Sequence, residues 1–260
     1  MSLPDILLNT LGAVLVLMLG AWMLSLLRQK ACVADSFWGL GFAVITWLAW
    51  SAGPGTSRSL LVVLLISIWG LRLFFHVTTR NWGQPEDRRY KAMREHHGRH
   101  FWWFSLFSVF ILQGVLLWII SLAPQLAQLS AVPAKLTWLD GLGIFVFATG
   151  FIFETVSDYQ MKCFRSNPAN KGKVMDKGLW GYSRHPNYFG ESLVWWGIFI
   201  IALATPYGWW AMISPLLITF LLLKVSGVVM LEKDISQRRP EYENYKREVS
   251  SFIPWFPARK

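Results

Sequence analysis

The sequence predicts an all-α integral membrane protein, a seven-transmembrane helix bundle. The first observation is composition, because 54% of the 260 residues are hydrophobic and 16 of them are Trp. The second is the recurrence of apolar segments, most of them long enough to cross a hydrocarbon core of about 30 Å as helices. We expect these helices at residues 5–27, 33–51, 59–79, 103–122, 138–160, 190–206 and 208–231.

The third observation is the distribution of Lys and Arg over the connections between these segments. Of the 25 basic residues, 21 follow the first, third, fifth or seventh segment, and only Arg58 and Lys135 lie in the opposite connections. The positive-inside rule then places the N-terminus outside and the C-terminus in the cytoplasm. The formal net charge of +10 is therefore expected to meet membrane lipids or phosphate-bearing ligands, and no nucleic acid.

The first segment has no basic region before it and no cleavage pattern after it, so we interpret it as a retained helix. The second segment carries Asp35 about two residues inside its apolar run. Such a carboxylate is either a helix-start residue stabilised by the helix dipole or a functional acid that faces the bundle, and both readings stay open here. Trp38, Gly39 and Gly41 beside it would allow another helix or a flat ligand to approach closely.

The third segment carries Arg72 and His76, four residues apart and therefore on one helix face. At 1.5 Å per residue Arg72 lies about 10 Å from the cytoplasmic end, and we expect it to point into a polar cavity. The long connection that follows mixes acids with bases, which predicts a partly helical cytoplasmic element. Its His96, His97 and His100 have no accompanying Cys, so we predict no metal site.

The fifth segment ends with Glu154, Asp158 and Lys162, which either form an ion-pair ladder along the helix or hydrogen-bond a ligand. Next comes KGLWGYSRHPNYFGE, residues 177–191, a dense group of polar side chains between two apolar segments. Such a group is costly beside lipid unless something polar is bound, so we expect a ligand-binding loop. The alternative is a plain connector whose Tyr and Trp lie at the headgroup level.

Ionisable residues inside the predicted helices gather in the cytoplasmic half of the bundle. They are Asp35, Arg72, His76, Glu154, Asp158, Glu191 and Lys224. A channel would need polar groups along its whole path, so this distribution predicts a pocket that is open to the cytoplasm, closed outside and reached sideways by a lipid-soluble substrate. Cys32 and Cys163 are interpreted as small apolar fillers without a disulfide.

The stretch GLWGYSRHPNYFGE and the tail RRPEYENYKREVSSFIPWFP resemble the steroid 5α-reductase C-terminal superfamily, and within it the bacterial branch called DUF1295. The resemblance is strong over residues 137–257 and weaker before them. It implies NADPH-dependent reduction of a carbon–carbon double bond conjugated to a carbonyl, in a lipophilic substrate and in a bacterial inner membrane, with no obligate protein partner. We expect one membrane domain over 1–260, with substrate-side helices in 1–122 and cofactor-binding helices and tail in 138–260.

The resemblance also implies the site residues, with cytoplasmic loops forming an NADPH site outside any Rossmann fold. The cofactor-binding residues would be Glu154, Asp158, Arg165, Lys173, Tyr182, Arg184, His185, Asn187, Tyr188, Glu191, Asp234, Arg238 and Tyr245. Among them Arg184 is suited to bidentate contact with the 2′-phosphate. Asp234 and Arg238 stand where the steroid enzymes have His and Tyr.

The catalytic residues implied are Asp35, with Arg72 and His76 as assistants. Asp35 corresponds to a Glu that holds the substrate carbonyl in the family, and burial would favour its neutral form, a hydrogen-bond donor. Trp69 stands where the family has a Tyr, and its indole has no phenolic proton to transfer.

Two other functions compete with the reductase. The pattern RHPxYxG followed by an acid is shared with integral-membrane methyltransferases of the isoprenylcysteine and phospholipid type, which bind S-adenosylmethionine. Asn187, Phe189 and Gly190 favour the reductase version of the pattern. The third possibility is a non-catalytic lipid-binding protein.

Overall fold

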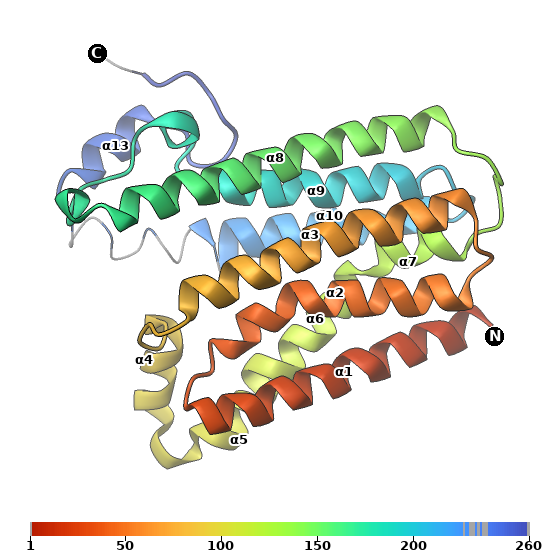
Figure 1. Cartoon of the computed structure of the whole chain (residues 1–260), viewed down its shortest axis with the longest axis horizontal. Helices are drawn as coiled ribbons and strands as arrows, with labels where there is room; N and C mark the ends of the chain where they lie inside the picture. Colours follow the sequence, from red (N-terminus) through yellow and green to blue (C-terminus); the bar gives the residue numbers. More distant parts are fainter. Residues whose placement is uncertain (1, 226, 229–231, 233–234, 236–238, 259–260) are drawn as a thin grey trace. The chain divides into compact units, whose positions relative to one another are not determined.

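The computed structural model describes residues 2–225, 227–228, 232, 235 and 239–258, which form helices and connections without a β-strand (Figure 1). The predicted all-α class is therefore confirmed for the part of the chain that is described. The chain divides into two compact units. Unit 1 comprises Met1–Thr137 and Ala202–Ile213, and unit 2 comprises Trp138–Ile201 and Ser214–Lys260.

Unit 1 is a helical bundle in which α1, α2 and α3 pack in succession (Figure 1). Its helices are α1 (Leu3–Arg28), α2 (Val33–Ala52), α3 (Ser57–Asn81), α4 (Arg88–His97), α5 (Phe101–Ser105), α6 (Leu112–Ile120) and α7 (Leu122–Leu129). The 3₁₀-helix η1 (Gly98–His100) and the π-helix η2 (Leu106–Ile111) connect α4, α5 and α6, and the 3₁₀-helix η5 (Gly208–Met212) packs on α7.

The packing of unit 1 depends on small residues beside Asp35. A Cβ atom on Gly39 of α2 would lie 2.5 Å from the carbonyl oxygen of Gly70 in α3, so only glycine allows this approach of the two helices. The expected close approach of another helix at this point is confirmed. Trp69, the neighbour of Gly70, is fully buried, and its ring lies 5.6 Å from that of Phe42.

Unit 2 is built on α8 and α9, with a folded tail. Its elements are α8 (Trp138–Ser166), η3 (Pro168–Asn170), η4 (Gly178–Gly181), α9 (Pro186–Ala202), α10 (Ile213–Phe220), the π-helix η6 (Leu221–Val225) and α13 (Tyr242–Glu248), with Ile213 of α10 in unit 1. A Cβ atom on Gly190 of α9 would lie 2.5 Å from the backbone nitrogen of Glu154 in α8, so these two helices are in backbone contact.

Six helical stretches of the described residues are long and apolar enough to cross a membrane, so the chain is an integral membrane protein. They are Leu3–Arg28, Val33–Ala52, Ser57–Asn81, Arg88–Ile120, Trp138–Ser166 and Gly208–Val225. The helix expected at 190–206 is α9, which begins four residues earlier and has 17 residues. The stretch 177–191 therefore contains the 3₁₀-helix η4 and the first turns of α9, which starts at Pro186, a residue suited to a position where no backbone N–H is required.

Candidate functional site

A cluster of polar side chains surrounds Asp35 near the start of α2. The Tyr90 hydroxyl donates to Oδ1 of Asp35 at 2.6 Å, and Arg89 Nη2 donates to Oδ2 at 3.1 Å. The Asp35 side chain keeps 20% of its surface exposed, whereas Tyr90 is buried. In the described part of the chain both side-chain hydrogen-bond partners of Asp35 come from α4. Asp35 also lies in the first turn of α2, so both interpretations of this carboxylate remain open.

Two carboxylates order the start of α4, and one of them, Glu86, attaches it to the connection between α1 and α2. Asp87 accepts from the Arg89 backbone nitrogen at 2.9 Å and from Arg89 Nε at 3.0 Å, so it caps the helix and orients the guanidinium. Glu86 accepts from Arg94 Nε at 2.9 Å and from Arg94 Nη2 at 3.0 Å. It also accepts from the backbone nitrogen of Ala31 at 2.7 Å, which attaches the residues before α2 to this segment.

Gln113 completes the cluster from α6, where its side-chain nitrogen donates to the Tyr90 hydroxyl at 3.2 Å. The Tyr90 oxygen thus accepts one hydrogen bond and directs its only proton at Asp35. Chemically, this arrangement presents a phenol O–H between an amide donor and a carboxylate. The π-helix η2 ends just before α6, and such segments alter the helical face on which the following side chains lie.

The other expected catalytic residues lie on α3. Arg72 and His76 are both half-buried there. Trp69, which stands at the position of the family tyrosine, is enclosed in the core of unit 1. The phenol near Asp35 comes instead from Tyr90, 55 residues away along the chain, and Tyr90 was not among the expected residues.

In unit 2 the centre of the polar network is the carboxylate of Glu232. Arg184 donates to it through Nε at 2.8 Å and through Nη2 at 3.1 Å. Nε2 of His185 lies 3.0 Å from Oε1, and the Tyr242 hydroxyl donates to the same oxygen at 3.1 Å. Burial alone raises the pKa of Glu232, but hydrogen bonds from His185 and Arg184 outweigh it and lower the pKa to about 2. Burial, with the charge of Glu232, raises the pKa of Tyr242, so the phenol keeps its proton.

Arg184 also holds the C-terminal tail. Its Nη1 donates to the carbonyl oxygens of Lys246 and Val249, both at 2.8 Å, and its backbone nitrogen donates to the carbonyl of Ser250 at 2.8 Å. Four of the five guanidinium N–H groups are thus used inside the chain. The expected contact of Arg184 with a 2′-phosphate stays a prediction.

Further hydrogen bonds attach the tail to the residues before α9. The Tyr245 hydroxyl donates to the Trp180 carbonyl at 2.6 Å, and Ser183 Oγ donates to the Phe252 carbonyl at 2.8 Å. Tyr242, Tyr245 and Val249 form a small buried core with Val174 and Ile235 packed against it. The described tail residues 239–258 are therefore a folded part of unit 2.

The remaining expected cofactor residues fall into three groups. Glu154 and Glu191 are buried and Asp158 is half-buried, on α8 and α9. Asn187 and Tyr188 lie in the first turn of α9, where the Tyr188 ring stacks on that of His185 with centroids 5.6 Å apart. The exposed members are Arg165, Lys173 and Tyr182. Asp234 and Arg238 lie outside the described residues.

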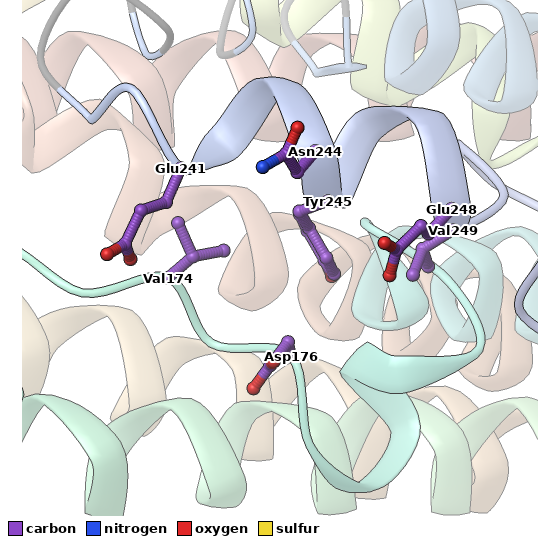
Figure 2. A pocket seen from close by; sticks show the side chains of 7 residues that line it. All are labelled: Val174, Asp176, Glu241, Asn244, Tyr245, Glu248 and Val249. Atoms are coloured by element: carbon purple, nitrogen blue, oxygen red, sulfur yellow. The ribbon is translucent and has the colours of Figure 1, made fainter. Parts of the chain in front are cut away.

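Two hollows open on the surface of unit 2. The first, of about 190 Å³, lies between α13 and the segment at 174–176, and its polar lining comes from Asp176, Glu241, Asn244, Tyr245 and Glu248 (Figure 2). The second has a volume of about 410 Å³ and is lined by Asp176, Lys177, Gly178, Gly181, Tyr182 and Pro257. Both hollows therefore combine hydrogen-bond acceptors with an aromatic side chain.

Sequence reasoning missed Arg89, Tyr90, Gln113 and Glu232 as partners in these networks. Gln113 carried a weak signal, as the main polar residue of an otherwise apolar segment. Tyr90 and Glu232 carried none, because their partners are distant in sequence.

Comparison with known proteins gives one family and several partial relatives. The model of the family described as "Protein of unknown function (DUF1295)" matches residues 21–249. A probable O-methyltransferase of Ustilaginoidea virens is 46% identical over 46 residues, which are 18% of this chain and 16% of that protein. No solved structure significantly matches the chain.

Two relatives match over longer stretches. An uncharacterized protein of Schizosaccharomyces pombe is 21% identical over 247 residues, 84% of this chain and 67% of that protein. A Delta(14)-sterol reductase of Ascobolus immersus is 26% identical over 156 residues, 54% of this chain and 34% of that protein. The chain thus spans about a third of the sterol reductase and less of the methyltransferase.

Proposed function

The chain belongs to the DUF1295 family, and from this premise we propose that it is a membrane-embedded, NADPH-dependent reductase. Its substrate in this proposal is a lipophilic molecule with a carbon–carbon double bond conjugated to a carbonyl. The observation that carries the proposal is the pair of Asp35 and Tyr90, which holds a phenol O–H in unit 1. The relative named as a sterol reductase supports a reductase with a lipophilic substrate.

Reduction of an enone requires a donor for the negative charge that develops on the carbonyl oxygen. In this proposal the donor is Tyr90, whose O–H turns from Asp35 to the carbonyl oxygen of the bound substrate, and a protonated Asp35 is not needed. Both oxygens of Asp35 accept hydrogen bonds, which fits a carboxylate that has no proton to offer. Gln113 donates to the phenol oxygen and stabilises negative charge there as the proton moves toward the substrate.

NADPH, when bound, supplies the hydride. The residues of unit 2 fit such a group in two respects. Exposed Arg165, Lys171 and Lys173 offer positive charge to phosphates. The carboxylates of the hollow in Figure 2, Asp176 among them, can accept hydrogen bonds from ribose hydroxyls. We therefore assign phosphate binding to the exposed cations and not to Arg184, because the Arg184 guanidinium already binds Glu232 and the tail.

The membrane arrangement that we propose has seven spans. α9, with 17 residues at 1.5 Å each, is about 25 Å long and lies at the lower limit for a membrane-crossing helix. Counting it as a span gives an odd number, which agrees with an N-terminus outside and a C-terminus in the cytoplasm of a bacterial inner membrane.

The second candidate is a methyltransferase that uses S-adenosylmethionine. The 46-residue match to a probable O-methyltransferase supports it. So does the acidic lining of the hollow in Figure 2, because Glu241 and Glu248 would suit a ligand with positive charge.

Ligand-induced stabilisation separates the candidates. A ligand at 100 times its Kd stabilises the folded state by about 2.7 kcal/mol, so the melting temperature of the detergent-purified protein should rise with NADPH and stay constant with S-adenosylmethionine. NADH should stabilise less than NADPH, and Lys173→Gln should reduce this preference, while Lys135→Gln serves as a matched control. Stabilisation by S-adenosylmethionine alone would replace the reductase with the methyltransferase, and stabilisation by neither would contradict both.

A further inference from the structure

The helix α4 separates its side chains into two faces with different partners. On the inner face Arg89 and Tyr90 contact Asp35, and Arg94 contacts Glu86. On the outer face Arg88, Lys91, Glu95 and His96 are exposed, followed by Arg99 and His100 of η1. The helix thus has one face with partners inside unit 1 and one face turned outward.

The acidic residues of this segment are mostly on the inner side. The Glu86 side chain is only 10% exposed and is held by Arg94, and Asp87 accepts from Arg89. Glu95 is the exposed acid of α4, and its nearest cation is Lys91, with the charged atoms 3.8 Å apart. The outer face therefore has a net positive charge contributed by Arg88 and Arg99 in addition to Lys91.

Length places this face at the membrane surface. The helical stretch Arg88–Ile120 has 33 residues. It is interrupted at Gly98, which ends α4 with a φ of +50°. The apolar part after η1, residues 101–120, has 20 residues, about the number that crosses the hydrocarbon core. The polar residues from Arg88 to His100 therefore lie beyond the core.

Exposed tryptophans flank α4 and η1 in the sequence. Trp102 and Trp103 follow η1 and are 55% and 45% exposed. Trp82 precedes α4, and the guanidinium carbon of Arg28 lies 4.9 Å from the centre of its ring. Trp is enriched at the level of the lipid headgroups, where an apolar body and a polar N–H are both accommodated.

We propose that the outer face of α4 and η1, defined by Arg88, Lys91 and Arg99, binds the phosphate headgroups of anionic phospholipids. Guanidinium groups match phosphate oxygens in bidentate geometry, and Trp102 and Trp103 set the depth of the face in the interface. The site is independent of the proposed reductase activity. It is carried by the helix whose opposite face holds Asp35, so a bound headgroup contacts the element that positions Tyr90.

The test compares lipids on the detergent-purified full chain by native mass spectrometry. The wild type should retain phosphatidylglycerol at least tenfold better than phosphatidylcholine, since each basic residue at an anionic surface contributes about a fivefold factor. The triple variant Arg88→Gln, Lys91→Gln, Arg99→Gln should lose tenfold or more of this preference. A control removes the same charge from exposed positions of unit 2, with the changes Lys162→Gln, Lys246→Gln and Arg247→Gln.

Three results would overturn the proposal. The first is a wild type without preference for phosphatidylglycerol. The second is an equal loss in both triple variants, which would mean that net charge alone attracts the lipid. The third is complete displacement of phosphatidylglycerol by millimolar inorganic phosphate, which would make the face a site for free phosphate. Binding of NADPH is measured separately, so failure of the reductase proposal leaves the lipid result intact.

Discussion

Glu232→Gln is expected to loosen the tail of unit 2 from the segment at 178–185. The substitution keeps the size of the side chain and removes the charge that Arg184 and His185 bind. Arg184 is buried, so it would keep a positive charge with weaker partners. Loss of one partner from a buried ion pair is destabilising because the other charge remains desolvated.

The pKa of Glu232 gives the magnitude. It is lowered to about 2 from the 4.5 of an unperturbed glutamate, and this difference corresponds to about 3 kcal/mol at 1.36 kcal/mol for each pH unit. Solvent screening at the partly open site reduces the contribution to about 2 kcal/mol. Because the folded-state pKa is depressed, this stability is present above pH 4.5 and disappears as the pH falls toward 2.

The assay is thermal unfolding of the detergent-purified protein between pH 7 and pH 2. At pH 7 the variant should melt about 4–8 °C below the wild type, and the two curves should converge at the acid end. Trypsin should also cleave the variant sooner after Lys246 and Arg247. The control is Glu95→Gln, an exposed carboxylate beside Lys91, which should change stability by less than about 0.5 kcal/mol. If Glu232→Gln behaves like this control at every pH, the carboxylate does not hold the tail.

Three further predictions concern other parts of the chain. Asp35→Asn and Tyr90→Phe should each slow turnover of an enone lipid by about 10²-fold while NADPH-induced stabilisation is unchanged, and normal turnover would remove either residue from the mechanism. Gly190→Ala should lower the free energy of unfolding by about 1–3 kcal/mol, because the added Cβ would push α9 away from α8. The control Gly141→Ala has open space around its Cβ and should not change stability, so equal melting temperatures of the two variants would contradict the contact. A reporter fused after the last residue should be cytoplasmic and one inserted at 205–208 external, and the reverse result would invert the proposed topology.

The long helices were predictable because each presents an apolar run to lipid or to its neighbours. α2 and α3 lie within two residues of the ranges expected from hydropathy. α7 and α13 were not predicted, since they have 8 and 7 residues and depend on tertiary packing. The early start of α9 was missed because a proline before an apolar run can close a loop or open a helix, and local sequence alone does not distinguish these.

The site was predictable only in part. Asp35 was identified because a carboxylate inside an apolar run requires a partner or a function. Its partner Tyr90 was not, because the hydrogen bond joins residues 55 positions apart across a connection of mixed charge. The sequence therefore predicted Asp35 as a site residue, whereas its partner Tyr90 is identified only from the structure.

The central stretch illustrates a different limit. Its density of donors and acceptors predicted a ligand, yet Arg184 and His185 find their partners in Glu232 and the tail. A polar cluster beside lipid must be satisfied, and either a ligand or another part of the chain can satisfy it. The sequence shows how many polar groups need partners, but it does not show whether a ligand or another part of the chain provides them.

This distinction changes how substitutions in unit 2 should be interpreted. Four N–H groups of Arg184 donate hydrogen bonds within the chain. Arg184→Ala should therefore lower stability and weaken the binding of NADPH and NADH to the same extent. Lys173 is exposed, and the hydrogen bond from Arg239 goes to its backbone carbonyl, which a substitution of the side chain retains. Lys173→Gln should therefore leave stability unchanged and reduce only the preference for NADPH. If Arg184→Ala reduces NADPH binding selectively at unchanged stability, then Arg184, and not the exposed cations, contacts the 2′-phosphate.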